Sequence, residues 1–265
     1  MKIVVCVKEI ADPEVASSVF SIDEAAKEVG PGVRFVISPF DAQAIEVALR
    51  IKDTRNETAI TLLTLGAESA RPIVKYGLSL GADEAVMLID AAFDGGDSYT
   101  TARALAAAIA KIGAVDLVLT GRQAADGDSG VVGLGIAELL GLPAVTFAMD
   151  VEVADKTLVI ERALGEGAEI VEVPMPAVVT VSHEVGKVRQ ANLRETMKAA
   201  RKPVTIWTAA DLGLTASEVG AAGARRSVER LYVPVTEMHC EFIDGVTPEM
   251  QMAKLVERLS TARLI

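Results

Sequence analysis

The sequence predicts an α/β fold built as a three-layer sandwich, with a mostly parallel sheet between two layers of helices. Two observations predict it. Up to residue 143, short apolar runs alternate with longer amphipathic runs, which is the pattern of a parallel sheet covered by helices on both faces. From residue 144, short β-type runs follow one another without helices between them, which predicts an added antiparallel β segment.

The elements up to residue 143 follow the order expected for such a sheet. Apolar periodicity predicts strands over 2–7, 59–65, 84–88 and 115–120, and helices over 41–52, 69–80, 98–112 and 131–140. Gly81 and Gly141-Leu142-Pro143 mark helix ends, since Gly favours the C-terminal turn and Pro cannot continue a helix. Asp41 follows Pro39-Phe40 and is predicted to cap the first helix.

The second half has a different pattern, with strands predicted over 145–153, 157–163, 169–173 and 177–182. Residues 183–206 read as a basic, polar excursion, residues 208–230 as a linker, and residues 231–265 as a strand or extended arm followed by a helix over 248–262. We therefore expect an α/β domain over 1–207, and a linker with a C-terminal arm over 208–265. Apolar side chains of the arm suit packing on a partner or on the chain's own core; they are Met250, Ala253, Leu255, Val256 and Leu259.

Composition excludes several classes of partner. The formal charge of −11 argues against nucleic acid and against an anionic membrane surface. No apolar run is long enough to span a membrane, and the run over 2–7 ends at Lys8 and Glu9 without a cleavage site, so it reads as a first strand. We expect a soluble protein that is not membrane-embedded, cytoplasmic or in the matrix of a mitochondrial source. Cys6 and Cys240 have no disulfide or metal spacing and are expected to be small buried residues.

The polar stretch after the strand at 115–120 is the strongest candidate for a ligand site. It reads Gly121-Arg122-Gln123-Ala124-Ala125-Asp126-Gly127-Asp128-Ser129-Gly130. Loops in this position bind ligands in open parallel sheets. Its mixture of carboxylates, amide, hydroxyl and glycine suits a sugar and base better than a bare anion, so we expect a nucleotide. An acidic turn capping the next helix is the alternative interpretation.

Within this loop the aspartates are expected to contact hydroxyls or to brace the loop, because two carboxylates would repel a phosphate. Ser129, Gly130 and the amides of Val131 and Val132 are left for phosphate. A second segment, Ser38-Pro39-Phe40-Asp41, also opens a helix after a strand-like run over 33–37. It is either a capped helix start or a second wall of the nucleotide pocket.

Other chemistry lacks a sequence signal. The glycines after the loop do not form the dinucleotide fingerprint, and the phosphate loop of nucleotide hydrolases is absent. No metal spacing or hydrolytic motif accompanies the two histidines, His183 and His239, which read as ordinary surface or core residues. We expect no metal site and no catalytic residues.

The segment Ala191-Asn192-Leu193-Arg194-Glu195-Thr196-Met197-Lys198 carries a capping-box spacing, with Asn192 at the cap and Glu195 three residues later. This predicts a short helix with Leu193 in its first turn. It is either a solvated surface helix or the carrier of an exposed apolar anchor for a partner.

Several of these segments together resemble the β subunit of electron-transfer flavoprotein. They match in order over nearly the whole chain, at 2–8 (KIVVCVK), 38–53 (SPFDAQAIEVALRIKD), 81–83 (GAD), 115–128 (VDLVLTGRQAADGD), 176–181 (PAVVTV) and 191–198 (ANLRETMK). The resemblance implies a Rossmann-like fold and a heterodimer with an α subunit that holds the redox-active FAD. It also implies AMP or a second FAD in this subunit.

Carried over by position, the resemblance implies a nucleotide pocket formed by Cys6, Ser38, Pro39, Phe40, Asp41, Leu65 and the loop from Gly121 to Val132. It implies that Leu193 docks an acyl-CoA dehydrogenase-type flavoenzyme, with electrons passing to a quinone reductase or another acceptor. The chain departs from the family in reading Ser129-Gly130-Val131-Val132 where many members carry Gln or Asn. AMP and a second FAD therefore both stay open, the latter as an NADH-oxidising, bifurcating form. A stand-alone adenine-nucleotide sensor is a further alternative, and an ATP-using enzyme is disfavoured.

Overall fold

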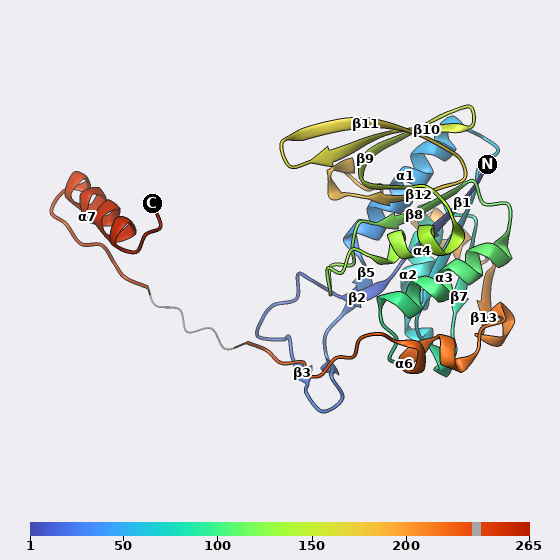
Figure 1. The fold of residues 1–265 in the computed structure, drawn as a ribbon, viewed down its shortest axis with the longest axis horizontal. Coiled ribbons are helices and arrows are strands. Elements are labelled where there is room, and N and C mark those ends of the chain that lie inside the picture. Colours follow the sequence, from blue (N-terminus) through green and yellow to red (C-terminus); the bar gives the residue numbers. More distant parts are fainter. Residues whose placement is uncertain (235–239) are drawn as a thin grey trace. The chain divides into compact units, whose positions relative to one another are not determined.

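The computed structural model describes residues 1–234 and 240–265, which divide into two compact units, Met1–Leu231 and Tyr232–Ile265. The first unit is built around a nine-stranded sheet (Figure 1). Its strands in spatial order are β11 (Gly167–Pro174), β10 (Thr157–Leu164), β9 (Ala144–Ala154), β12 (Ala177–Val181), β8 (Leu117–Gly121), β1 (Lys2–Cys6), β6 (Ala59–Leu65), β7 (Glu84–Leu88) and β13 (Val204–Trp207).

Pairing in this sheet is parallel from β9 to β13 and antiparallel only where β10 joins β9 and β11. The predicted parallel sheet with an added antiparallel meander is thereby confirmed. The central strands are almost fully buried, as expected for runs of Val, Ile and Leu covered on both faces.

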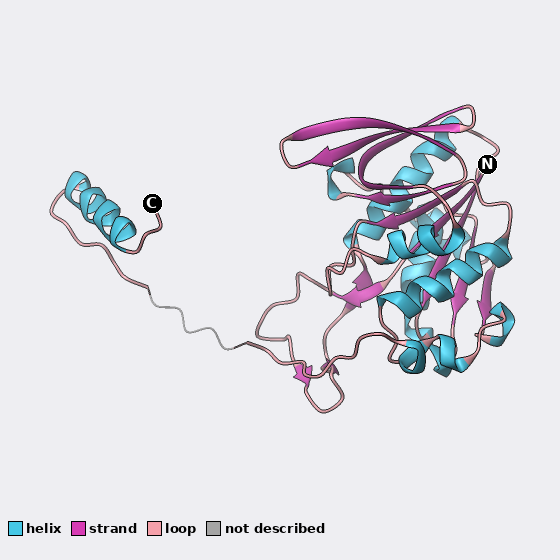
Figure 2. Cartoon of the chain, in the orientation of Figure 1, coloured by secondary structure: helices cyan, strands magenta, loops and turns pink. Residues whose placement is uncertain are grey.

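Four helices make the outer layers of the sandwich (Figure 2). They are α1 (Pro39–Thr54), α2 (Arg71–Leu80), α3 (Ser98–Ile112) and α4 (Val132–Leu140). Helices α1 and α2 share one buried apolar cluster with Ile3 and Val5 of β1, while α3 and α4 share the other with Val4 of the same strand. This alternation along β1 confirms the three-layer prediction, since successive strand side chains point to opposite faces.

The helix boundaries lie within two residues of the predicted ones. Gly81 and Gly141 follow α2 and α4 with positive φ angles of 138° and 64°, as predicted. The prediction that Asp41 caps α1 is wrong: the cap position is Ser38, and Asp41 lies in the first turn. Pro39 fixes this start, because its ring suits the first helical position.

Two further predictions need correction. The run over 33–37 forms only β5 (Phe35–Ile37), which pairs with β2 (Glu9–Ala11) outside the central sheet; β3 (Ile22–Asp23) and β4 (Glu28–Val29) form another small pair. The excursion over 183–206 contains η3 (His183–Val185), α5 (Leu193–Ala199) and β13. Strand β13 escaped prediction because it is a short edge strand with exposed side chains on both sides of its pleat.

The stretch over 208–230, expected to be a linker, contains short helical elements up to Gly223. This stretch forms η4 (Ala210–Leu212), η5 (Ala216–Glu218) and α6 (Gly220–Gly223), and Val219 is completely buried in the α3 cluster. An ion pair between Arg103 of α3 and Glu218 also joins it to the sandwich. That the nucleotide-binding domain ends at residue 207 stays a prediction.

The second unit contains α7 (Pro248–Thr261), which confirms the predicted helix. Thr247 caps it, and Lys254 and Arg258 pair with Asp244 and Glu241 at 3.5 and 2.9 Å. Cys240 is exposed, which contradicts the expectation of a buried residue. His239 and part of the expected strand lie outside the described residues. Among the described helices, none has both the length and the apolar character needed to cross a bilayer.

Candidate nucleotide site

The site lies where the chain reverses its direction of travel across the sheet. From β1 the chain proceeds through α1, β6 and α2 to β7, and then α3 returns it to β8 on the other side of β1. The carboxyl ends of β1 and β8 therefore diverge into connections on opposite faces, and a crevice is expected between them. Both candidate segments, 38–41 and 121–132, lie at this edge of the sheet.

Asp41 connects the two strand ends. Its Oδ2 accepts a hydrogen bond from the Lys8 backbone N–H just after β1, at 2.8 Å, and its Oδ1 accepts one from the Gly121 N–H at the end of β8, at 3.0 Å. The side chain is 7% exposed. Burial raises the pKa of this carboxyl to about 7, and the two N–H groups offset only part of that rise. Asp41, in the first turn of α1, is thus a buried clamp between the ends of β1 and β8.

Gly121 is the point of closest backbone approach. A Cβ added there would lie 2.6 Å from Asp41 Oδ1, 2.7 Å from Phe40 Cβ and 2.9 Å from the Phe40 carbonyl carbon. Any other residue would push the end of β8 away from the start of α1. The glycine is required by space and not by a left-handed backbone.

The loop after Gly121 is braced by its own carboxylates. Lys8 Nζ lies 2.7 Å from Asp126 Oδ2, and Gln123 Nε2 donates to Asp128 Oδ1 at 2.7 Å. Asp128 adopts a left-handed φ of 47°, which Asp tolerates better than most residues. Of the two roles expected for these aspartates, the structure shows bracing. Lys8 compensates part of the negative charge that would otherwise repel a phosphate.

Arg122 lies over aromatic rings at the base of the loop. Its guanidinium carbon is 4.9 Å from the Phe40 ring centre and 5.8 Å from that of Phe147, and Nη1 lies 3.3 Å from Ser182 Oγ. Phe40 in turn makes an edge contact with His183. These contacts hold Phe40 between Arg122 and His183.

Polar groups without hydrogen-bond partners lie at this edge of the sheet. The Ser38 hydroxyl is completely buried, and neither it nor Arg122 Nε has a hydrogen-bond partner within the described residues. The α4 cap, Val131, offers no side-chain oxygen to the first N–H groups of that helix, which have no intrahelical acceptor. A buried hydroxyl and a helix N-terminus of this kind fit a ligand that carries hydroxyls and phosphate.

Two predicted residues, Cys6 and Leu65, contribute apolar side chains at the same edge. Cys6 ends β1, buried among apolar side chains, and burial raises the pKa of its thiol, so it is an inert wall. Leu65 ends β6 and packs against the same cluster. Leu193 lies elsewhere, on α5, which packs beside α2. Sequence reasoning missed Lys8, which directly follows the strand predicted over 2–7, and Ser182, which is the last residue of the strand predicted over 177–182.

A separate groove of about 680 Å³ lies between α2 and the segment around α5, lined by Pro72, Lys75, Tyr76, Ser79, Gln190, Ala191, Thr196 and Ala200. None of the predicted nucleotide residues lines it. Its place beside α5 makes it relevant to that helix and not to the crevice at β1 and β8.

Comparison with known proteins adds the family. Residues 31–212 match the model of the electron transfer flavoprotein domain. The chain is 36% identical over 266 residues to the caffeyl-CoA reductase-Etf complex subunit CarD of Acetobacterium woodii, and 37% identical over 267 residues to the electron transfer flavoprotein subunit beta of Thermoanaerobacterium thermosaccharolyticum, in each case over 100% of both chains. Protein FixA of Azorhizobium caulinodans is 35% identical over 88% of this chain and 85% of its own.

Proposed function

The chain belongs to the electron-transfer flavoprotein family, among its β subunits and FixA proteins, and we propose that it carries electrons as the β subunit of a heterodimer. The proposed donor is an acyl-CoA dehydrogenase-type flavoenzyme, and the acceptor is a quinone reductase or another electron acceptor. One relative, subunit CarD, is named as part of a complex with a caffeyl-CoA reductase, an enzyme that acts on an acyl-CoA thioester, which supports a donor or acceptor of this class.

We propose that the crevice at β1 and β8 binds an adenine nucleotide. The observation that carries this is the Asp41 clamp, which ties the ends of β1 and β8 together beside the unpartnered Ser38 hydroxyl. Loop amides from Ser129 to Val132 would hold phosphate at the start of α4, and Cys6 and Leu65 would form the apolar wall. When bound, AMP would add stability to the folded state, whereas a flavin would supply hydride and one-electron chemistry.

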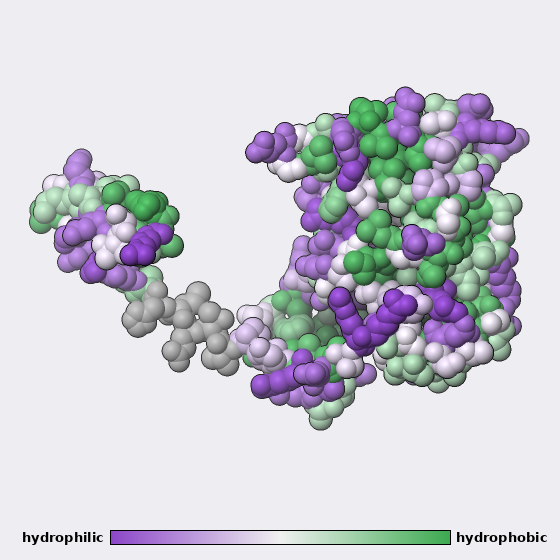
Figure 3. All heavy atoms as spheres, viewed as in Figure 1, coloured by the Kyte–Doolittle hydropathy of each residue, from purple (hydrophilic) through white to green (hydrophobic). Residues whose placement is uncertain are grey.

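The α subunit is the proposed partner for the exposed apolar surface of this chain. Figure 3 shows apolar side chains gathered over α4 and along the antiparallel meander. Exposed members on these elements are Leu134, Leu139, Phe147, Leu164 and Ile170. Exposed apolar patches mark interaction sites in otherwise charged proteins.

A second flavin, with oxidation of NADH, is the second candidate function. It is favoured by Val131, which is 49% exposed at the start of α4, because a flavin ring offers an apolar side chain more contact than a ribose does. One experiment decides: the chain is co-expressed with its α subunit, the complex is denatured, and released FAD and AMP are quantified. Two FAD per heterodimer would support the bifurcating form, and one FAD with one AMP the simple carrier. A flavin-free homo-oligomer would instead support a nucleotide sensor and contradict the proposal.

Leu193 is the proposed docking anchor, and its removal gives a direct prediction. It is 78% exposed on the first residue of α5, where Asn192 and Glu195 form the predicted capping box. Leu193→Ala should slow electron transfer from the dehydrogenase about tenfold or more, since a buried Leu contributes about 2 kcal/mol to a contact. The flavin spectrum should not change.

Met197, 65% exposed one turn later on the same helix, provides the matched control for this test. Met197→Ala removes a comparable apolar side chain and should have the smaller effect on the transfer rate. Stopped-flow reduction of the heterodimer by the dehydrogenase measures both variants. Equal rates for the Leu193 variant and the unmodified protein would remove Leu193 from the docking role.

A further inference from the structure

Helix α5 is held in place by little apolar packing of its own. It spans seven residues, and within the described structure its only buried side chain is Ala199. A helix of this length is not stable in isolation. The groove of about 680 Å³ beside α2 opens against the same helix at Thr196 and Ala200. The direction in which α5 presents Leu193 must therefore be set by contacts at its two flanks.

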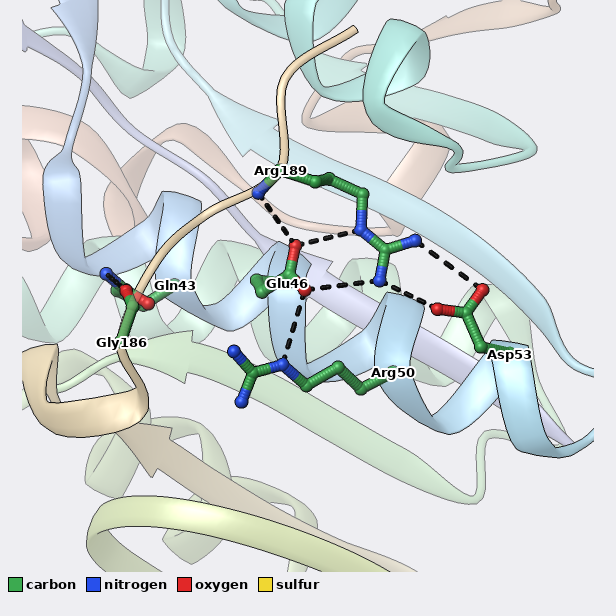
Figure 4. A network of polar contacts seen from close by, with 6 residues as sticks. All are labelled: Gln43, Glu46, Arg50, Asp53, Gly186 and Arg189. Carbon is green, nitrogen blue, oxygen red and sulfur yellow. Dashed lines mark hydrogen bonds and ion pairs between the residues drawn. The ribbon is translucent and has the colours of Figure 1, made fainter.

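The N-terminal flank is fixed to α1 by an ion-pair cluster, the Glu46 cluster, formed by Glu46, Arg50, Asp53 and Arg189 (Figure 4). Arg189 lies between the two carboxylates. Its Nε and backbone N–H donate to Glu46 Oε2 at 2.9 and 3.1 Å, its Nη2 donates to Glu46 Oε1 at 3.1 Å, and Nη2 also lies 2.8 Å from Asp53 Oδ2. The cluster therefore holds Arg189 by hydrogen bonds from both its side chain and its main chain.

The hydrogen-bond acceptors of the Glu46 carboxylate are all occupied in this arrangement. Each of its oxygens accepts two hydrogen bonds, the fourth being from Arg50 Nε at 3.3 Å. Burial alone would raise the pKa of this carboxyl, but the hydrogen bonds and charge of Arg189 outweigh it and leave the pKa below its usual range. An Arg–carboxylate pair whose carboxylate is buried and fully hydrogen-bonded has one geometry, so it specifies position more than it adds stability.

Hydrogen bonds to main-chain carbonyls hold the rest of the segment on both sides of α5. Gln43, one turn earlier on α1, donates to the Gly186 carbonyl at 2.8 Å. After α5, Lys75 of α2 donates to the carbonyls of Ala199, Ala200 and Lys202 at 3.2 to 3.4 Å. Lys202 reaches back to the carbonyl of Leu78 at 2.9 Å and to that of Ala82. The irregular chain on either side of α5 is thus tied to α1 before the helix and to α2 after it.

We infer that Glu46 and Arg189 are positioning residues, which fix the main chain three residues before Asn192 and so set the direction in which α5 presents Leu193 to a redox partner. The docking part of this inference rests on the proposed function. The positioning part rests on the contacts alone. No part of the cluster touches the nucleotide crevice residues in the described structure, so its effect should be confined to docking.

The test uses the heterodimer with its α subunit and replaces both charges at once. Glu46→Gln with Arg189→Gln leaves no single charge buried without its partner, which would otherwise be strongly destabilising. Arg50→Gln is the matched control, because it removes one hydrogen bond from Glu46 while leaving residue 189 bound. The acyl-CoA dehydrogenase from the same source, reduced by its own substrate, is the electron donor.

The double variant should raise the apparent KM for the dehydrogenase about tenfold, with kcat changed less than about twofold, since weakened docking removes binding and not electron transfer itself. Amide hydrogen exchange over residues 187–199 should accelerate at least about tenfold. Flavin and nucleotide content should not change. Arg50→Gln should alter none of these measurements.

A mutant cycle, which combines the double variant with Leu193→Ala, separates positioning of α5 from general destabilisation of the chain. If the Glu46 cluster acts through Leu193, the double variant should add little to the KM of a chain that already carries Leu193→Ala. The inference would be overturned if the double variant raised the KM by the same factor with and without Leu193→Ala. It would also be overturned if the double variant left amide hydrogen exchange over 187–199 unchanged. An unchanged KM for Leu193→Ala alone would instead refute the docking role itself, and amide exchange would still decide whether the cluster positions the helix.

Discussion

Gly121→Ala is expected to abolish nucleotide retention by the heterodimer. The added methyl group would lie 2.9 Å or less from Asp41 Oδ1 and from two carbon atoms of Phe40, one of them in the backbone. Because the backbone of α1 cannot move without disturbing its packing on the sheet, the end of β8 would have to move instead. Overpacking of this kind costs about 1–3 kcal/mol, and the displacement would open the Asp41 clamp at the same time. Quantifying nucleotide released on denaturation measures the loss.

Gly127 offers the matched control in the same loop. A Cβ placed there meets no described atom within 4 Å, and its backbone is not left-handed. Gly127→Ala should therefore retain nucleotide at the level of the unmodified chain. Full retention by Gly121→Ala would show that the nucleotide does not depend on the contact between β8 and α1, and would move the site elsewhere.

Asp41→Asn is expected to have the second largest effect. The amide can accept one hydrogen bond through its oxygen, but its nitrogen donates, so either the Lys8 or the Gly121 N–H loses its acceptor. A buried N–H left in this way costs about 1–3 kcal/mol. We expect nucleotide affinity to fall about tenfold or more, because each 1.4 kcal/mol is one factor of ten.

Asp126→Asn makes the same chemical change in the same site and is the control. It breaks the pair with Lys8, whose side chain is half exposed, and exposed pairs contribute less than about 1 kcal/mol. Titration of the nucleotide-depleted heterodimer with AMP and with FAD compares the two variants. Similar affinities in both would argue against the clamp.

The pH dependence of stability gives Asp41 a further test. Burial raises its pKa from 3.8 to about 7 in the folded chain, so between these values the folded state binds more protons than the unfolded state. The contribution of this carboxyl to the free energy of unfolding therefore falls as pH rises from about 4 to about 7. Asp41→Asn lacks that dependence. Its Tm should lie furthest below that of the unmodified heterodimer near pH 4, and the difference should shrink toward pH 8. A difference independent of pH would contradict the raised pKa.

Much of the fold could be predicted from the sequence because its buried strands are continuous apolar runs with glycine and proline at the turns. The strands at 59–65 and 84–88 and the helix at 98–112 have the predicted bounds. Edge elements could not be found in this way. The pattern of β13 is that of an exposed loop, because its stability comes from pairing with β7 and not from its own burial.

The candidate site was predictable at the level of segments, since loops after parallel strands meet at one edge of the sheet. The role of Asp41 was not predictable, because an acidic residue near a helix start is typical of a cap. Only the structure shows that its carboxylate faces across to Lys8 and Gly121. The Glu46 cluster was equally hidden, because its partners are 143 positions apart along the chain.

The segment that carries α5 leaves the sheet from β12 and returns to it at β13, with β8, β1, β6 and β7 between them. Both of its ends are therefore immobilised when the sheet forms, and the entropy of closing the segment is lost during folding. A partner that binds Leu193 would not have to order a free loop, so more of its contact energy would appear as affinity. Lengthening the segment by a few residues should change the stability of the fold little. The longer segment would then lose its conformational entropy when the partner binds, and the affinity for the partner should fall.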